Sequence, residues 1–201
     1  CELSKEMLPY TKFYFEELLN KQSIQNVQPS SEWYEERLDY SKESLGTSLK
    51  KHINHGFELI RGTSEFEGKI LGGCLESIFD FFDNSRYEEL FPSLEEWKGK
   101  ILLLETSEEK PTPDIFREMI KKLEEFGLFD VISGLLVGKP QNETYYEEYK
   151  TIVLDEISNK TLCIVYNVNV GHATPRCIIP FGINAQVNIK EQIISFDYGD
   201  Y

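Results

Sequence analysis

The run GKILLLETSEEKPTPDIFREMIKKLEEFG, residues 99–127, contains two patterns that together decide the fold. Residues 101–104 are continuously apolar and end at Glu105, as in a strand buried on both faces. From Thr112 onward the apolar side chains have helical spacing. Thr112 is a suitable N-cap, Pro113 suits the first helical position, and Gly127 follows the last turn. The run therefore predicts a buried strand followed by an amphipathic helix.

The same alternation continues along the chain. VISGLLVG (131–138) predicts a second strand, NETYYEEYKTIVLDEIS (142–158) a second amphipathic helix, and TLCIVYNV (161–168) a third strand. Strands that alternate with helices imply right-handed crossovers and a parallel sheet, so the predicted fold class is α/β. The tail, residues 177–198, predicts two or three short strands that fold back, with a turn near Gly182.

The amino-terminal quarter of the chain has a different pattern of apolar and charged residues. Residues 1–25 combine helical spacing with an interruption at Pro9, and residues 30–51 are rich in charged and aromatic side chains, which predicts a peripheral helix or an excursion from the core. A boundary is expected near residues 52–58. After it come a glycine-rich entry and a helix-like apolar run over residues 75–82.

Charge and cysteine usage exclude several function classes. The 21 basic and 35 acidic residues give a net charge of -14, so DNA, RNA and anionic membrane surfaces would be repelled. No apolar run approaches the roughly 20 residues that span a bilayer, and no leader resembles a signal peptide, which predicts a cytoplasmic protein. The four cysteines lack CxxC spacing and a paired histidine, so we expect no metal and no cofactor. A first residue Cys1 instead of Met predicts a piece of something longer.

Two residues that could share a site follow predicted strands. Glu105 ends the first strand, Gly138 and Lys139 follow the second, and His172 in NVGHA (169–173) follows the third. The carboxyl ends of parallel strands meet at one edge, so Glu105 and His172 are expected to face the same crevice. A carboxylate that accepts a hydrogen bond from an imidazole fixes its tautomer and leaves the other ring nitrogen as a general base. The alternatives are a solvated carboxylate and a structural histidine.

A nucleophile for such a pair is not evident. The chain has no G-x-S-x-G elbow, Ser133 lies inside a strand, and Ser107 lies in an acidic loop whose neighbours Glu108 and Glu109 are interpreted as plain solvation. The sequence thus presents two thirds of a triad. Either the pair performs other acid–base or metal chemistry, or the third member lies outside this chain.

Four further residues are weaker candidates for substrate binding. Arg176 could bind a substrate carboxylate or form a surface salt bridge, and Lys110 could meet an anionic group or remain a solvated loop charge. Trp33 and Phe57 could form an aromatic lid or pack at the edge of the core.

Four segments together carry a family likeness: EFEGKILGGCLESI (65–78), GKILLLETSEEKPTPD (99–114), FDVISGLLVGKPQNETYYEEY (129–149) and IVYNVNVGHATPRCIIPFG (164–182). They resemble the carboxyl-terminal domain of the LD-carboxypeptidase family of serine peptidases, in the branch of the microcin C self-immunity (MccF-like) peptidases. The resemblance covers roughly residues 52–190. It implies a swivelling-type β/α domain with a parallel sheet and appended short strands over residues 53–201, and assigns residues 1–52 to the end of an amino-terminal domain and the interdomain linker.

The resemblance also implies roles. The family cleaves amide bonds beside a free carboxylate with a Ser–His–Glu triad; its Glu matches Glu105 and its His matches His172. Its serine, on a nucleophile elbow of the amino-terminal domain, and its oxyanion-hole donors match no position here, so the isolated chain should be inactive. The sequence departs from the family pattern at Cys74, where relatives commonly have Asn. This difference affects the expected local packing and little else.

Several functions remain open on this resemblance. The substrate is either a microcin-C-like peptidyl or aminoacyl nucleotide or the murein tetrapeptide of cell-wall recycling. The segment LLLETSEEKPTPD (102–114) favours the nucleotide. A non-catalytic binding or structural module is the competing class, and a metal site is weaker because two ligands are too few. The expected partners are the small substrate, the protein's own amino-terminal domain and, in a homodimer, a second copy.

Overall fold

The computed structural model describes residues 7–20, 24–36, 41–43, 46–83 and 86–199. The strands are β1 (Ile24–Val27), β2 (Glu32–Tyr34), β3 (Lys51–Ile53), β4 (Glu58–Arg61), β5 (Glu65–Cys74), β6 (Ile101–Glu105), β7 (Gly134–Gly138), β8 (Cys163–Val168), β9 (Asn184–Asn188) and β10 (Ile193–Asp197). The helices are α1 (Pro9–Leu19), α2 (Leu75–Asp83), α3 (Leu94–Trp97), α4 (Pro113–Phe126), α5 (Leu128–Val131) and α6 (Tyr146–Glu156), with short 3-10 helices η2 (Glu88–Leu90) and η3 (Gln141–Glu143).

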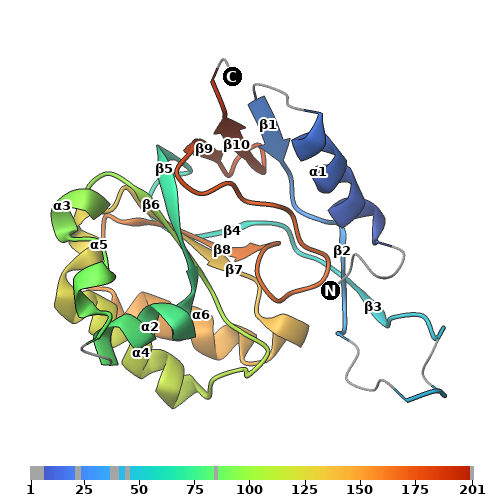
Figure 1. Cartoon of the computed structure of the whole chain (residues 1–201), viewed down its shortest axis with the longest axis horizontal. Coiled ribbons are helices and arrows are strands. Elements are labelled where there is room, and N and C mark those ends of the chain that lie inside the picture. Colours follow the sequence, from blue (N-terminus) through green and yellow to red (C-terminus); the bar gives the residue numbers. More distant parts are fainter. Residues whose placement is uncertain (1–6, 21–23, 37–40, 44–45, 84–85, 200–201) are drawn as a thin grey trace.

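The main sheet has the strand order β1-β10-β9-β5-β6-β7-β8-β4. Its centre, β5-β6-β7-β8, is parallel, whereas β4 and the β9-β10-β1 group pair antiparallel at the two sides. Figure 1 shows α2 to α6 grouped on one side of the parallel strands and β9, β10, β1 and α1 on the other. The α/β fold that the sequence predicts is confirmed.

Two cores lie on opposite faces of the parallel strands. Because side chains alternate along a strand, Leu102 and Leu104 of β6 pack beneath the helices, whereas Ile101 and Leu103 pack against the returning strands. All five residues of β6 are buried, as expected for a strand covered on both faces. The continuous apolar runs of β7 and β8 have the same cause.

The predicted strand–helix–strand–helix–strand unit is confirmed, with small shifts. In α4 the Thr112 side chain accepts the Ile115 N–H, and Gly127 closes the helix in the left-handed region at φ 85°. The second helix begins at Tyr146 instead of residue 142, because Asn142 and Tyr145 adopt left-handed backbone conformations before it. The tail forms the two strands β9 and β10, with Gly182 in the turn that precedes them.

The strand β5 was missed by the sequence analysis, which recognised only a glycine-rich entry before α2. It runs over ten residues and pairs with β6 in parallel. Glycine is needed at position 72 because a Cβ there would lie 1.9 Å from the Leu103 carbonyl oxygen, at φ 145°. Gly72, which weakens the strand pattern in the sequence, is therefore what permits the close pairing with β6.

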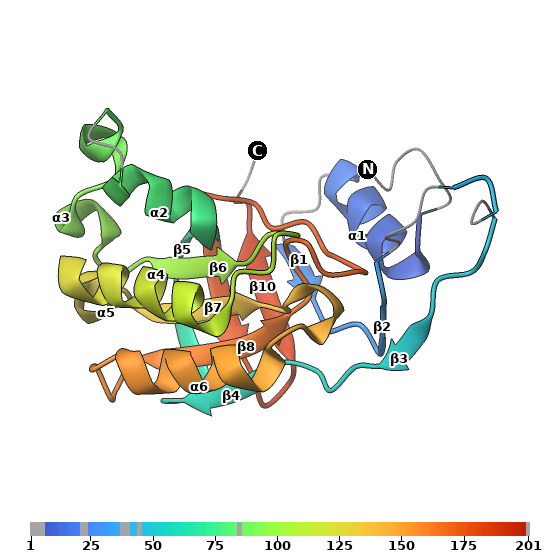
Figure 2. The ribbon, with the colours of Figure 1, turned by 90° about the horizontal axis from the view of Figure 1, so that it is seen from below.

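The amino-terminal segment is interlocked with the main sheet. Over residues 30–51 the described part forms the β2-β3 pair, an excursion and not a helix (Figure 2). The preceding strand β1 pairs with β10, and Tyr14 and Val27 are buried in the same core as β9 and β10. The domain boundary after residue 52 stays a prediction. In the described part of the chain, no helix has both the length and the apolar character needed to cross a membrane.

Candidate functional site

The carboxyl edge of the parallel strands gathers the residues of interest. Glu105 ends β6 and stands in register with Cys74 at the end of β5. Lys139 follows β7, and His172 lies four residues beyond β8, in a turn. The shared edge follows from the parallel pairing of these strands, and it brings together residues that are far apart in sequence.

The structure brings Glu105 and His172 into direct contact. Oε2 of Glu105 lies 2.8 Å from Nδ1 of His172 and also accepts the backbone N–H of His172 at 3.2 Å. The Glu105 side chain is 10% exposed and that of His172 is 35% exposed. Burial raises the pKa of the Glu105 carboxyl above its ordinary value, although its bonds to His172 act in the opposite direction. The carboxylate therefore holds both the ring and the backbone of His172.

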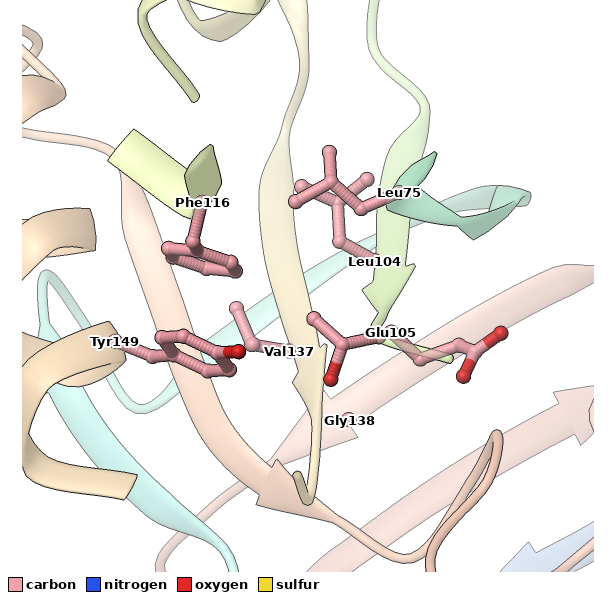
Figure 3. A pocket seen from close by; sticks show the side chains of 8 residues that line it. Leu75, Leu104, Glu105, Phe116, Val137, Gly138 and Tyr149 are labelled. Atoms are coloured by element: carbon pink, nitrogen blue, oxygen red, sulfur yellow. The ribbon is translucent and has the colours of Figure 1, made fainter. Parts of the chain in front are cut away.

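Two glycines make room for this carboxylate. A Cβ at Gly171 would lie 2.2 Å from Oε2 of Glu105, and one at Gly138 would lie 2.8 Å from its Cβ. Gly171 also has φ 80°, a conformation that disfavours other residues. In Figure 3 the Glu105 carboxylate points away from the apolar side chains of Leu104, Val137 and Phe116. These three residues and Glu105 itself are among those that line a small pocket.

The second ring nitrogen of His172 faces Glu108. Its Nε2 lies 2.9 Å from Oε2 of Glu108, whose side chain is 64% exposed. The loop that carries Glu108 is anchored by Glu76, whose Oε1 accepts the backbone N–H and the hydroxyl of Ser107 at 2.9 and 2.7 Å. An imidazole donates to carboxylates through both nitrogens only as imidazolium. Before Nε2 can act as a base it must therefore part from Glu108, and the exposure of that side chain permits this.

The interpretation of Glu108 as plain solvation was incomplete. Glu108 lies three residues after Glu105 in the loop that follows β6, and its carboxylate reaches Nε2 of His172. The link from Glu76 to Ser107 was missed too, because no local pattern joins positions in different crossovers. The sequence offered only the proximity of Glu108 to a strand end as a signal.

The two predicted basic residues lie in the loops that follow β6 and β8. Arg176 lies 3.9 Å from Glu36 and donates to the Thr174 hydroxyl at 3.3 Å, which agrees with the salt-bridge alternative. Lys110 is half-buried at φ 51°, and its backbone N–H donates to Ser107. Roles in substrate binding stay predictions for both.

The two predicted aromatic residues are buried. Phe57 is 3% exposed and packs in the core with the returning strands, so the structure favours core packing over a lid. Trp33 is 6% exposed, and its ring stacks on His52 with centroids 4.2 Å apart. Neither ring is open to a ligand in the conformation described, and stacking on a substrate by Trp33 would require His52 to move. Among the described side chains, no group of three or more His, Cys, Asp or Glu could hold a metal ion.

Central parallel strands with a Glu–His pair beyond their carboxyl ends define the class, an α/β domain with a site at one sheet edge. Comparison with known proteins gives the family: residues 67–187 match the LD-carboxypeptidase C-terminal domain. The chain belongs to the LD-carboxypeptidase family of serine peptidases, in its MccF-like group.

Individual relatives agree with this assignment. The chain is 54% identical to an MccF-like protein from Streptococcus pneumoniae, crystallised in complex with AMP, over 98% of this chain and 60% of that chain, with a TM-score of 0.91. An MccF-like protein from Bacillus anthracis is 26% identical over 96% of this chain and 56% of that chain, with a TM-score of 0.76. A protein of Treponema pallidum (strain Nichols) named "Putative carboxypeptidase" is 28% identical over 71% of this chain and 40% of its own length. The chain thus spans about two fifths to three fifths of the length of these relatives.

Proposed function

We propose that this chain supplies the histidine and the carboxylate of a Ser–His–Glu triad in a serine carboxypeptidase that hydrolyses an amide bond of peptidyl or aminoacyl nucleotides. The contact between Glu105 and His172 carries the proposal, because it holds Nδ1 and leaves Nε2 at the surface of the edge. The family assignment supports a hydrolase. The AMP bound by the 54% identical relative supports a nucleotide-containing substrate.

The chemistry follows from the geometry. Glu105 accepts Nδ1–H and thereby sets the tautomer in which Nε2 has its lone pair free. Once Glu108 has moved aside, Nε2 takes the proton of a serine hydroxyl as the oxygen attacks the scissile carbonyl, and later gives that proton to the leaving nitrogen. The buried carboxylate stabilises the imidazolium that forms between these two steps.

The nucleophilic serine and the oxyanion-hole donors are proposed to lie on an amino-terminal domain that is not part of this chain. The resemblance supports this arrangement, as does the greater length of the relatives. The cytoplasmic location, the homodimer and a contribution to resistance against microcin-C-like antibiotics are proposals that rest on the same resemblance.

Activity measured in the protein that combines this chain with such a domain tests the triad. We expect His172→Ala to lower kcat by about 10³-fold or more with the fold retained. His52→Ala is the matched control, because His52 also pairs with a glutamate, Glu35, at 2.8 Å, but outside the sheet-edge site. Unchanged turnover in His172→Ala with lowered stability would instead support a structural module. Hydrolysis at enzymatic rates by the 201-residue chain alone would contradict the missing-serine proposal.

A murein tetrapeptide is the second candidate substrate, favoured by the match to an LD-carboxypeptidase domain. Assaying the same protein on an aminoacyl nucleotide and on an LD-tetrapeptide separates the two. A higher kcat/KM for the nucleotide is the expected result.

A further inference from the structure

Lys139 is a buried lysine for which the proposed reaction has no direct use. It follows β7 at the same edge as Glu105 and His172, and it is 1% exposed. Its ammonium contacts three oxygens, on Glu143 at 2.5 Å, Asn167 at 3.2 Å and Asn54 at 3.4 Å. An ammonium has three N–H donors, so this set accounts for all of them.

The position of Lys139 explains why its charge is tolerated there. The carboxylate of Glu143 supplies the opposite charge, and the rings of Trp33 and Tyr146 lie 5.0 and 5.2 Å from the ammonium. Burial lowers the pKa of the Lys139 ammonium, whereas the bond to Glu143 acts against that shift. A buried ion pair costs desolvation free energy, so a purely apolar packing would serve stability at least as well.

One partner of Lys139 stabilises an unusual stretch of backbone. Asn167 lies inside β8 at φ 68°, where the pairing of β7 with β8 shifts register. Its side-chain amide donates to Asn54 at 3.1 Å and to the Gly56 carbonyl at 2.6 Å, while its oxygen accepts from Lys139. Hydrogen bonds at both the nitrogen and the oxygen of its side-chain amide thus hold Asn167 in the left-handed conformation, five positions before His172.

A second partner of Lys139, Asn54, extends the hydrogen-bond network to residues 169–177, the loop that carries His172. The Asn54 amide nitrogen donates to the Ser30 carbonyl at 2.9 Å and to the side-chain oxygen of Asn169 at 3.4 Å. Asn169 is fully buried, and its side-chain oxygen also accepts the Ser30 N–H. Its own carbonyl accepts the Cys177 N–H at 2.8 Å, which ties the start of the loop to its end.

We propose that Lys139 is a positioning residue for His172: through Asn167 and Asn54 its ammonium fixes the two ends of residues 167–169, and so sets the approach of the imidazole to Glu105. The proposal rests on the proposed function, because the approach of the ring matters for catalysis only if His172 is the base. An apolar side chain at position 139 would leave the buried Asn167 oxygen without its donor and the Glu143 carboxylate without its charged partner, and the segment before His172 would relax.

The test uses the imidazole itself as the readout, in the 201-residue chain, so that no activity is needed. Ring ¹⁵N chemical shifts report the ratio of Nδ1–H to Nε2–H tautomers of neutral His172, assigned with a His172→Gln variant. In Lys139→Met we expect this ratio to fall about tenfold, since the bond to Glu105 loosens.

Lys150→Met is the matched control. Lys150 is also largely buried, bonds to Glu58 at 2.7 Å and Glu147 at 3.1 Å, and faces the Tyr146 ring. In the described part of the chain, neither of these carboxylates bonds to residues 167–172. We expect it to lose stability without a change in the His172 tautomer ratio. Equal ratios in folded Lys139→Met and wild type would overturn the proposal.

A second variant keeps the test decisive if Lys139→Met does not fold. Asn54→Ala cuts the link to Asn169 but leaves the ion pair of Lys139 with Glu143 in place. The ratio must fall in this variant as well, and an unchanged ratio refutes the proposal. Activity assays separate the proposed function from the proposed role of Lys139. Loss of turnover in His172→Ala supports His172 as the general base, whatever the tautomer ratio in Lys139→Met.

Discussion

Replacing Gly171 by Ala should break the contact between Glu105 and His172 from the backbone side. The new Cβ would lie 2.2 Å from Oε2 of Glu105, far inside van der Waals contact. Two costs arise. A non-glycine residue at φ 80° costs about 1–2 kcal/mol. Displacing the carboxylate removes a hydrogen bond between charged or polar partners that contributes about 1.5–3 kcal/mol. We therefore expect the free energy of unfolding to fall by about 2.5–5 kcal/mol.

Gly182→Ala supplies the control for this prediction. Gly182 has the same φ of 80°, yet nothing lies within 4 Å of the position of its Cβ, so only the backbone cost of about 1–2 kcal/mol should appear. Urea unfolding of wild type and both variants measures the difference. Equal losses of stability in Gly171→Ala and Gly182→Ala would refute the reasoning, because the steric effect on Glu105 would then be absent.

Two further predictions concern pH and a helix end. Burial raises the pKa of the Glu105 carboxyl above 4.5, so the folded chain binds the carboxyl proton more tightly than the unfolded chain does. The stabilisation from this proton is therefore complete below pH 4.5, and it is lost as the pH rises through the raised pKa. Relative to Glu105→Gln, wild type should thus lose stability as the pH rises above 4.5, and a constant difference in urea unfolding would contradict this. The Arg61 guanidinium donates to the carbonyls of Leu154, Ile157 and Asn159 at the end of α6, so Arg61→Met should cost about 1–2 kcal/mol. Amide exchange in the last turn of α6 should quicken, and unchanged exchange there would count against this role.

Much of the fold was accessible from local patterns. The apolar run before Glu105, the caps of α4 and the alternation of strands with helices are each set by a few neighbouring residues, and the structure confirms them. The strand β5 was not accessible in this way, because glycine is unfavourable in an isolated strand, and Gly72 is required only because the Leu103 carbonyl lies beside it. The start of α6 moved because Glu143 and Tyr145 adopt left-handed backbone conformations that their residue types do not signal.

The shared edge of Glu105 and His172 followed from the sequence because it depends on the parallel direction of the strands. Parallel strands place their carboxyl ends at one edge, and both residues stand at strand ends. The burial of Phe57 could not be deduced, since aromatic side chains look alike in sequence whether they line a site or a core.

By itself the sequence determined the α/β class, the parallel pairing around residues 99–168 and the partnership of Glu105 with His172, because these depend on periodicity and chain order. Only the tertiary structure decided which imidazole nitrogen meets Glu105, that Glu108 covers the other, and that Lys139 is joined to Asn54 and Asn167. These contacts bring together residues from separate crossovers and loops. Their geometry is fixed by how the segments pack, which no local pattern encodes.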